Sequence, residues 1–228
     1  MSRSALAAPD KAQCGIAALL LITLALNGCG VVGRTSIKTV QLAMQGVPDV
    51  QPSAADVAAK PYPQIKVRGP NGSAVLVLGN IDAGRQAWYS SERSIVFLQD
   101  GLLVGTHGGS PELQQMWIEG DNPFHDLHRL QGTITVHRQY DLMPSYRYGV
   151  SVTGTLERLG TESVDILGKA RTLVHVRETL RGTQWSGENH FWVDPASGFI
   201  WKSQQMIAPG TRLEITQLKP YSLDLQRR

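Results

Sequence analysis

The chain has 228 residues, of which 42% are hydrophobic and 18% charged, and its formal net charge is +3. This is the composition of an ordinary globular protein, and the length fits one domain or a closely packed pair with a real hydrophobic core. The basic residues are scattered rather than clustered. This argues against a nucleic-acid groove, so we expect no nucleic-acid partner.

Residues 1–28 read as a lipoprotein signal peptide. The apolar run 14–26 suits a secretory signal and is too short to span a bilayer of about 30 Å. It ends in Leu26-Asn27-Gly28-Cys29, which matches a lipobox, where a signal peptidase cuts before the cysteine. We therefore predict a Cys29 that carries S-linked diacylglycerol and an N-acyl chain such as palmitate. An ordinary signal peptide or a short membrane anchor is the alternative.

The predicted anchor also bears on location. Three acyl chains exceed the two signals needed for stable membrane attachment. Residue 30 is Gly rather than Asp, so the usual inner-membrane retention signal is absent. By the sorting rule of enterobacteria, we expect an outer-membrane protein that faces the periplasm. Without residues 1–28, Cys29 is the only cysteine, so neither an internal disulfide nor a thiolate metal cluster is expected.

The first part of the mature chain is predicted to be a tether followed by short strands. Residues 29–52 show weak periodicity and two prolines, which is typical of a linker. Ser53 is placed to cap a short helix over 54–59, which should end before Pro61. Strands are predicted at 74–78, 85–89, 94–99 and 102–106, with Asn80 and Gly84 in the first turn and Asp100-Gly101 in a type I′ hairpin turn.

The second part is predicted to consist mainly of long strands. A helical turn at 110–112, a short strand at 116–118 and an irregular or helical connector at 124–130 come first. The strands expected after them are 132–140, 146–156, 162–167, 170–181, 188–193, 199–206 and 211–218. We therefore predict an all-β, mainly antiparallel domain over 53–228. It should be a large β-sandwich or half-open β-barrel with a short N-terminal helix.

Several stretches resemble the YjbF/GfcB family of group 4 capsule and exopolysaccharide lipoproteins. The matching segments, spread over roughly 53–221, are 54–65, 76–79, 86–89, 100–104, 189–194, 198–201, 203–204 and 218–220. The chain departs from the family at 108–111, where an apolar residue usually precedes the proline. The resemblance implies an antiparallel β protein at the outer membrane, encoded with polysaccharide-export components. It implies no catalytic activity.

Candidate catalytic and metal-binding residues are few. His125, Asp126 and His128 have a spacing suited to a metal, but no third ligand is evident nearby, and an exposed connector is the favoured interpretation. The stretch 107–110 resembles an oxyanion-hole loop, but the Gly-x-Ser-x-Gly elbow is missing. The carboxylates that could act on a glycoside are Glu178, Glu188 and Asp194, although structural or surface roles are favoured. We predict no catalytic residue, metal or cofactor.

The five tryptophans allow two interpretations. Aromatic faces stack on sugars, so an exposed row would suit a glycan, whereas buried tryptophans build a core. Core packing is favoured for each, but Trp88, Trp117 and Trp185 are kept as candidate contacts for a glycan or a partner. Trp192 and Trp201 flank the turn 195–198 and are predicted to be cross-strand partners.

Three functions remain open from the sequence. The favoured one is a non-catalytic accessory lipoprotein of capsule or exopolysaccharide export, which binds a glycan or an export protein of the outer membrane or periplasm. The second is a carrier of lipids or lipoproteins, which would need a deep apolar cavity. The third is a glycan-processing enzyme, which would need paired carboxylates in a cleft.

Overall fold

The computed structural model describes residues 49–226, so the predicted leader, Cys29 and the tether up to residue 48 lie outside the described residues. The first element is the short helix α3 (Ala54–Ala58). The Ser53 hydroxyl accepts a hydrogen bond from the Asp56 amide at 3.1 Å, and the Asp56 carboxylate accepts one from the Ser53 amide at 3.0 Å. This reciprocal cap confirms the predicted helix start. Within 49–226, no helix is long and apolar enough to cross a membrane.

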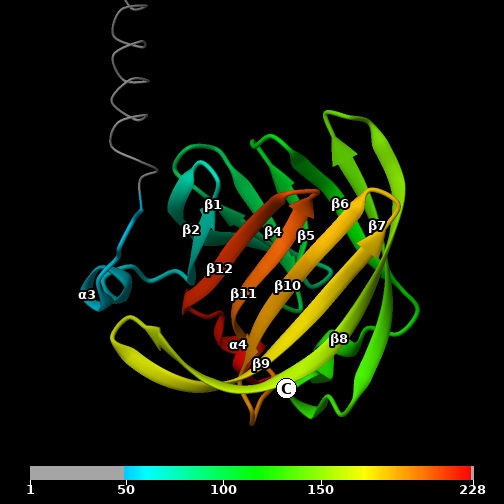
Figure 1. The fold of residues 1–228 in the computed structure, drawn as a ribbon. Coiled ribbons are helices and arrows are strands. Elements are labelled where there is room, and N and C mark those ends of the chain that lie inside the picture. Colours follow the sequence, from blue (N-terminus) through cyan, green and yellow to red (C-terminus); the bar gives the residue numbers. More distant parts are fainter. Residues whose placement is uncertain (1–48, 227–228) are drawn as a thin grey trace, which may run out of the picture. The chain divides into compact units, whose positions relative to one another are not determined.

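The described residues contain twelve strands, which form one antiparallel sheet (Figure 1). The strands are β1 (Gln64–Gly69), β2 (Gly72–Asp82), β3 (Arg85–Tyr89), β4 (Ile95–Gln99), β5 (Leu102–His107), β6 (Glu112–Glu119), β7 (Thr133–Met143), β8 (Arg147–Ile166), β9 (Lys169–Gly182), β10 (Trp185–Val193), β11 (Ile200–Ala208) and β12 (Thr211–Lys219). A 3-10 helix, η1 (Pro123–Arg129), joins β6 to β7, and α4 (Ser222–Gln226) follows β12. Each strand pairs with its neighbours in the sequence except at the β5–β6 connection, and β1 also pairs with β12.

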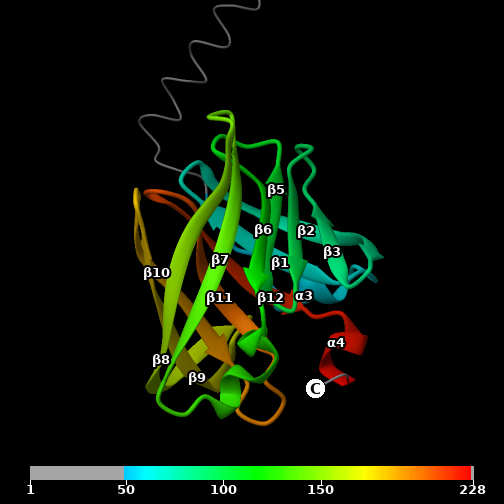
Figure 2. The same ribbon diagram turned by 90° about the vertical axis from the view of Figure 1, so that its right-hand side faces the viewer.

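The sheet curls into a nearly closed barrel, whose free edges are β5 and β6. These two strands lie side by side without a backbone ladder (Figure 2). A side chain links them, because the Leu113 amide donates a hydrogen bond to Thr106 Oγ1 at 2.9 Å. The predicted all-β, half-open barrel with a short N-terminal helix is therefore confirmed.

The barrel interior is filled with side chains. Among the largest fully buried residues are Trp88, Trp185, Tyr140, Phe124 and Phe191. The rings of Tyr140 and Trp185 lie 4.3 Å apart, and those of Phe124 and Phe191 lie 5.1 Å apart, close to edge-on. Burial raises the pKa of the Tyr140 hydroxyl to about 12. The interior is thus a packed core rather than a ligand chamber.

The structure confirms some of the predicted turns and corrects others. Asp100 and Gly101 both have positive φ, at 53° and 81°, as a type I′ turn requires. Asn80 instead lies inside β2, and the turn after β2 is formed by Ala83 and Gly84. The predicted helical turn at 110–112 is wrong, because Glu112 already begins β6 and pairs with Met143.

One predicted strand break is also wrong. A single strand of 20 residues, β8, covers the stretches 146–156 and 162–167 except for their outermost residues, Tyr146 and Leu167. A bulge between Arg158 and Gly160 takes the place of the expected break. The side chains from Glu157 to Ser163 are exposed on both faces, which hides the alternation that marks a strand in the sequence.

Candidate functional site

Beyond its bulge, the β8–β9 hairpin leaves the barrel and curves along the outside of the sheet (Figure 1). It covers a second, smaller hydrophobic cluster on the outer face. The buried members of this cluster are Ile166, Leu173, Trp192, Phe199 and Trp201. The guanidinium of Arg171 lies 3.5 Å from the centre of the Trp201 ring and adds a cation–π contact. These contacts make the hairpin a fixed wall beside the barrel.

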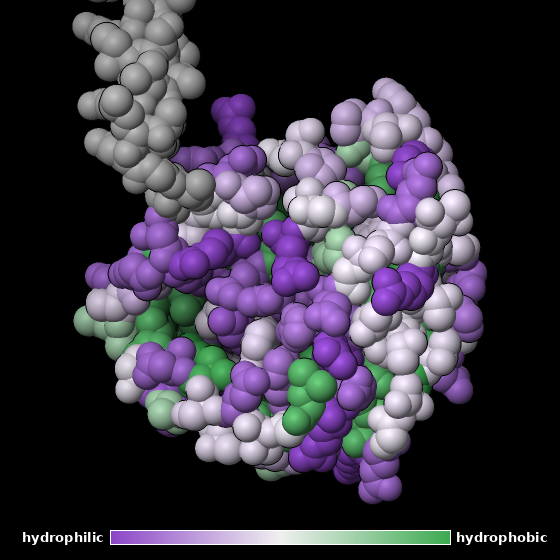
Figure 3. All heavy atoms as spheres, viewed as in Figure 1, coloured by the Kyte–Doolittle hydropathy of each residue, from purple (hydrophilic) through white to green (hydrophobic). Residues whose placement is uncertain are grey.

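A cleft of about 450 Å³ lies between this wall and the start of the described chain. Its floor is the outer face of β1, β12 and β11, and its walls are the segment 51–54 and the β8–β9 turn. The lining residues are Gln51, Pro52, Ser53, Ala54, Lys66, Arg68, Asp165, Ile166, Leu167, Gly168, Lys202, Glu214, Thr216 and Leu218. Figure 3 shows this face as mostly hydrophilic, with hydrophobic residues gathered at its lower left.

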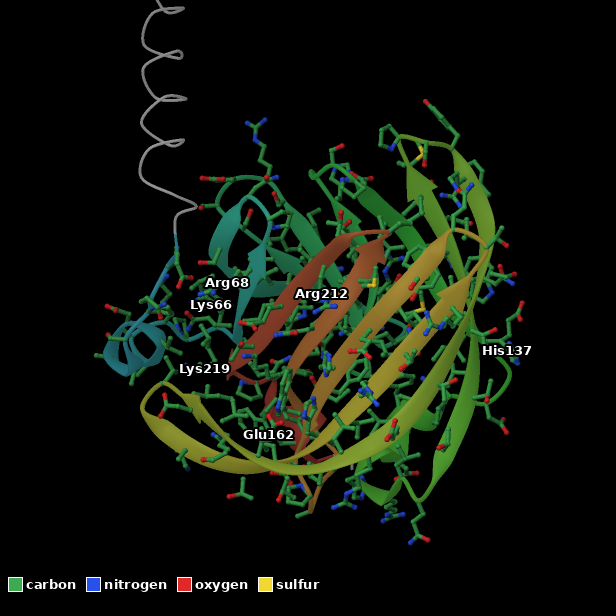
Figure 4. All side chains as sticks on the ribbon, in the orientation of Figure 1. Lys66, Arg68, His137, Glu162, Arg212 and Lys219 are labelled. Carbon is green, nitrogen blue, oxygen red and sulfur yellow. The ribbon has the colours of Figure 1, made fainter. Side chains whose placement is uncertain are left out.

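The strand register places the polar residues of this face in one row. Lys66 pairs with Thr216, and Thr216 pairs with Lys202 on its other side. Lys202 then pairs with Trp192, and Trp192 with His175. With strands about 4.8 Å apart, a row across five strands spans roughly 19 Å. Figure 4 shows Lys66 and Arg68 at one end of this face and Glu162 on β8 at the other.

Each cation of the cleft has a carboxylate beside it. Asp49 binds Lys66 Nζ at 2.9 Å and also pairs with Arg68, while Glu214 binds Lys202 Nζ at 3.0 Å. Hydrogen bonds from Lys66, and then from Ser73, hold the pKa of Asp49 well below its usual range. Burial raises the pKa of Glu214, but hydrogen bonds, including one from Lys202, outweigh it and the pKa is lowered. The cleft therefore offers both charge signs at neutral pH.

The other end of the row is a hydrogen-bonded cluster around two histidines. Glu162 contacts His175 Nδ1 at 2.6 Å and accepts a hydrogen bond from Trp192 Nε1 at 2.7 Å. His175 Nε2 lies 3.0 Å from His190 Nδ1, and its ring stacks on Trp192 with centroids 4.7 Å apart. The hydrogen bonds from Trp192 and His175 lower the pKa of Glu162. Burial and the charge of His175 lower the pKa of His190.

This arrangement suits the recognition of a polar molecule. Hydrogen-bond donors and acceptors follow one another along the row, and the apolar side chains of Ile166, Leu167 and Leu218 line the cleft beside them. In residues 49–226, no group of three or more His, Cys, Asp or Glu side chains is placed to hold a metal ion. The side chains of the described cleft offer hydrogen bonding and ion pairing beside an apolar surface.

The structure does not bring the three candidate carboxylates together. Glu178 points into the barrel, where it is buried against Arg138. Glu188 lies on the outer face and pairs with Arg177 and His190, both at 3.6 Å. Asp194 accepts hydrogen bonds from backbone amides of the following turn. The three carboxylates therefore have separate partners in different parts of the sheet.

The candidate histidines are also separated. On η1, His125 lies 3.7 Å from Asp100, whereas the ring of His128 packs against Gly198 of another turn. The two imidazoles therefore contact different neighbours. His107 lies 3.4 Å from Glu112 at the start of β6. It is far from the outer cleft and beside no serine nucleophile elbow.

The tryptophans mostly build core, as favoured. Trp88 and Trp185 are 0% and 1% exposed, and neither ring reaches the surface. The prediction that these two tryptophans contact a glycan or a partner is therefore wrong. Trp117, on the outer face of β6, is 39% exposed and keeps an accessible ring. The predicted pairing of Trp192 with Trp201 is wrong, because a register shift pairs Trp192 with Lys202. Trp192 and Trp201 share the outer cluster instead.

Comparison with known proteins identifies the family. The family model described as "Group 4 capsule polysaccharide lipoprotein gfcB, YjbF" matches residues 37–218. The chain is 25% identical over 210 residues to the uncharacterized lipoprotein GfcB of Escherichia coli K12, covering 89% of this chain and 97% of that protein. Its fold is similar to the crystal structure of the hypothetical lipoprotein YmcC from E. coli K12. That similarity has a TM-score of 0.68 at 24% identity and covers 75% and 90% of the two chains. The chain belongs to the YjbF family of group 4 capsule polysaccharide lipoproteins.

Proposed function

We propose that this protein is a non-catalytic accessory lipoprotein of capsule or exopolysaccharide export that binds a glycan in its outer cleft. In this proposal residues 1–28 are a cleaved signal peptide, Cys29 carries the lipid, and residues 29–52 tether the domain 53–228 to the outer membrane. The domain faces the periplasm, where it can meet the polysaccharide and the proteins that export it. Family membership supports the link to capsule.

The observation that carries the proposal is the contrast between the interior and the exterior of the barrel. Sugars present many hydroxyl groups, which need paired donors and acceptors together with some apolar surface. The outer cleft provides both, through Lys66, Lys202, Glu214 and Thr216 beside Leu218. The cleft is also open to solvent and lies on a sheet. This openness suits a long polysaccharide chain that passes through the cleft.

The two alternatives fit the described residues less well. A carrier of lipids or lipoproteins needs a deep apolar cavity, but the interior is packed, and the apolar opening at one end of the barrel measures about 220 Å³. A glycan-processing enzyme needs two carboxyl groups across a sugar site. Glu178 and Glu188 instead lie on opposite faces of the sheet, which argues against this chemistry.

The test is to fill the cleft. Thr216 lies on the outer face at the centre of the row, and Thr216→Trp would occupy the space between Lys66 and Lys202. We expect the variant to lose binding of purified capsular polysaccharide in calorimetry and to fail to restore surface polysaccharide in a deletion strain. Thr155→Trp is the matched control, because Thr155 is also a half-buried threonine on an outer strand face, on β8. Unchanged binding and export in Thr216→Trp would refute glycan recognition by this cleft.

A further inference from the structure

One end of the barrel, here called the mouth end, carries six of the strand turns, including the β9–β10 turn beside the β7–β8 turn. The β1–β2, β3–β4, β5–β6 and β11–β12 connections meet around the apolar opening of about 220 Å³. The β7–β8 turn belongs to the same end, because Met143 at the end of β7 pairs with Glu112 at the start of β6. Figures 1 and 2 show the β7–β8 hairpin projecting beyond its neighbours.

The projecting hairpin tip exposes two aromatic rings. Tyr146 is 70% exposed and Tyr148 is 59% exposed, the largest values among the tyrosines of the described barrel strands and turns. Pro144 and Ser145, also exposed, complete the tip, and Arg147 stands between the two tyrosines. An exposed pair of tyrosines flanking an arginine is the composition that sits at the boundary of a bilayer, with rings at the level of the headgroups.

The start of the described chain is fastened at this same end. The Asp49 carboxylate accepts a hydrogen bond from Ser73 at 2.7 Å and pairs with Arg68, and the Val50 amide donates to Ser73 at 2.7 Å. Arg68 and Ser73 flank the β1–β2 turn. The described part of the chain therefore begins at the mouth end, on the side of the domain that follows Cys29 in the sequence.

We propose that the mouth end is a second membrane contact, in which the β7–β8 tip enters the headgroup layer of the bilayer that holds the lipid anchor. The 19 residues between Cys29 and Asp49 could extend to about 70 Å, so the length of the tether does not by itself set the orientation of the domain. Insertion of the β7–β8 tip into the headgroup layer would set the orientation of the domain relative to the bilayer. The exposed arginines Arg93 and Arg212 at neighbouring turns strengthen the contact with anionic lipids.

The experiment measures vesicle binding without the lipid anchor. The mature chain carrying Cys29→Ser is sedimented with vesicles of phosphatidylethanolamine, with and without phosphatidylglycerol. We expect binding that increases with phosphatidylglycerol and falls at high salt. Adding Tyr146→Ser and Tyr148→Ser should weaken the apparent affinity by about tenfold, whereas Tyr146→Trp alone should preserve it.

The control is Tyr62→Ser, because Tyr62 is as exposed as Tyr148, at 59%, but precedes β1 at the end of the strand away from the mouth. It should bind vesicles like the parent chain. Binding of the double tyrosine variant at the parent's affinity would overturn the proposal, as would a parent chain that binds neither vesicle. Glycan binding is measured separately through Thr216→Trp, so failure of one proposal is distinguishable from failure of the other.

Discussion

The buried ion pair between Arg138 and Glu178 is the most constrained polar contact inside the barrel. Arg138 Nε and Nη2 donate hydrogen bonds to the two Glu178 oxygens at 2.7 and 2.8 Å, and Asn189 donates another to Glu178 at 2.8 Å. Gly154 leaves room for the carboxylate, because a β-carbon there would lie 2.2 Å from Glu178 Oε1. Such a pair adds little net stability, but breaking one half leaves an uncompensated buried charge.

We predict that Glu178→Gln lowers the free energy of unfolding by about 3–5 kcal/mol, because the Arg138 charge loses its counterion without any change in side-chain shape. Urea denaturation followed by circular dichroism measures this difference. The control is Glu157→Gln, since Glu157 forms an exposed pair with Arg177 at 2.9 Å. That variant should cost less than about 1 kcal/mol. Equal losses in the two variants would contradict the role given to burial.

At the scale of elements, the outer faces of β9 and β10 carry a group of charges that responds to acid. The pKa of His190 on β10 is lowered by burial and by the neighbouring His175 on β9. Arg212 on β12 and Arg177 on β9 lower it further, and Glu188 opposes them. The folded protein therefore resists protonation of His190 more than the unfolded chain does.

The lowered pKa of His190 determines the direction in which the free energy of unfolding changes with pH. When the pH falls through about 6.5, the unfolded chain takes up a proton at His190 that the folded state refuses, so the free energy of unfolding decreases. We predict a flatter dependence for His190→Gln between about pH 7.5 and 5.5 in urea titrations. His137→Gln is the matched control, because His137 is exposed on β7 away from this group (Figure 4). Equal flattening in both variants would contradict the assignment to His190.

How much of the fold the sequence predicts depends on whether the signal is local. The Asp100-Gly101 turn and β3 were predictable because turn chemistry and alternation lie within a few residues of each other. The continuity of β8 was not, because its middle is exposed on both faces and shows no alternation. The Ser53 cap was again a local signal and was predicted correctly.

The outer cleft and the row of paired residues that continues from it to the histidine cluster could not be predicted for a related reason. Lys66, His175, Trp192, Lys202 and Thr216 come from five strands, and only the register of those strands aligns them. None of them forms a motif in the sequence. Register depends on bulges, such as the shift between Trp192 and Val193, and a slip of one residue would turn each side chain to the other face.

At the scale of the whole molecule, the barrel interior and the outer cluster have different roles. The packed interior gives the domain its stability, and the β8–β9 hairpin, held by the outer cluster, forms one wall of the cleft. The main core of the described residues is built from the strands and η1. We expect the domain to remain folded without the lipid, and the predicted anchor to affect its location.

This leads to a prediction for the full chain. Cys29→Ser would remove the attachment point of three acyl chains, and with them the affinity that holds the protein on the membrane. We expect the variant to appear in the soluble fraction after a high-salt wash, to lack lipid in its intact mass, and to melt within about 2 °C of the lipidated protein. Ser36→Ala, in the predicted tether, should stay lipidated and membrane-bound. A Cys29→Ser chain that kept a lipid-modified mass and resisted the wash would refute the lipobox, and one that melted much earlier would show that the anchor contributes to folding.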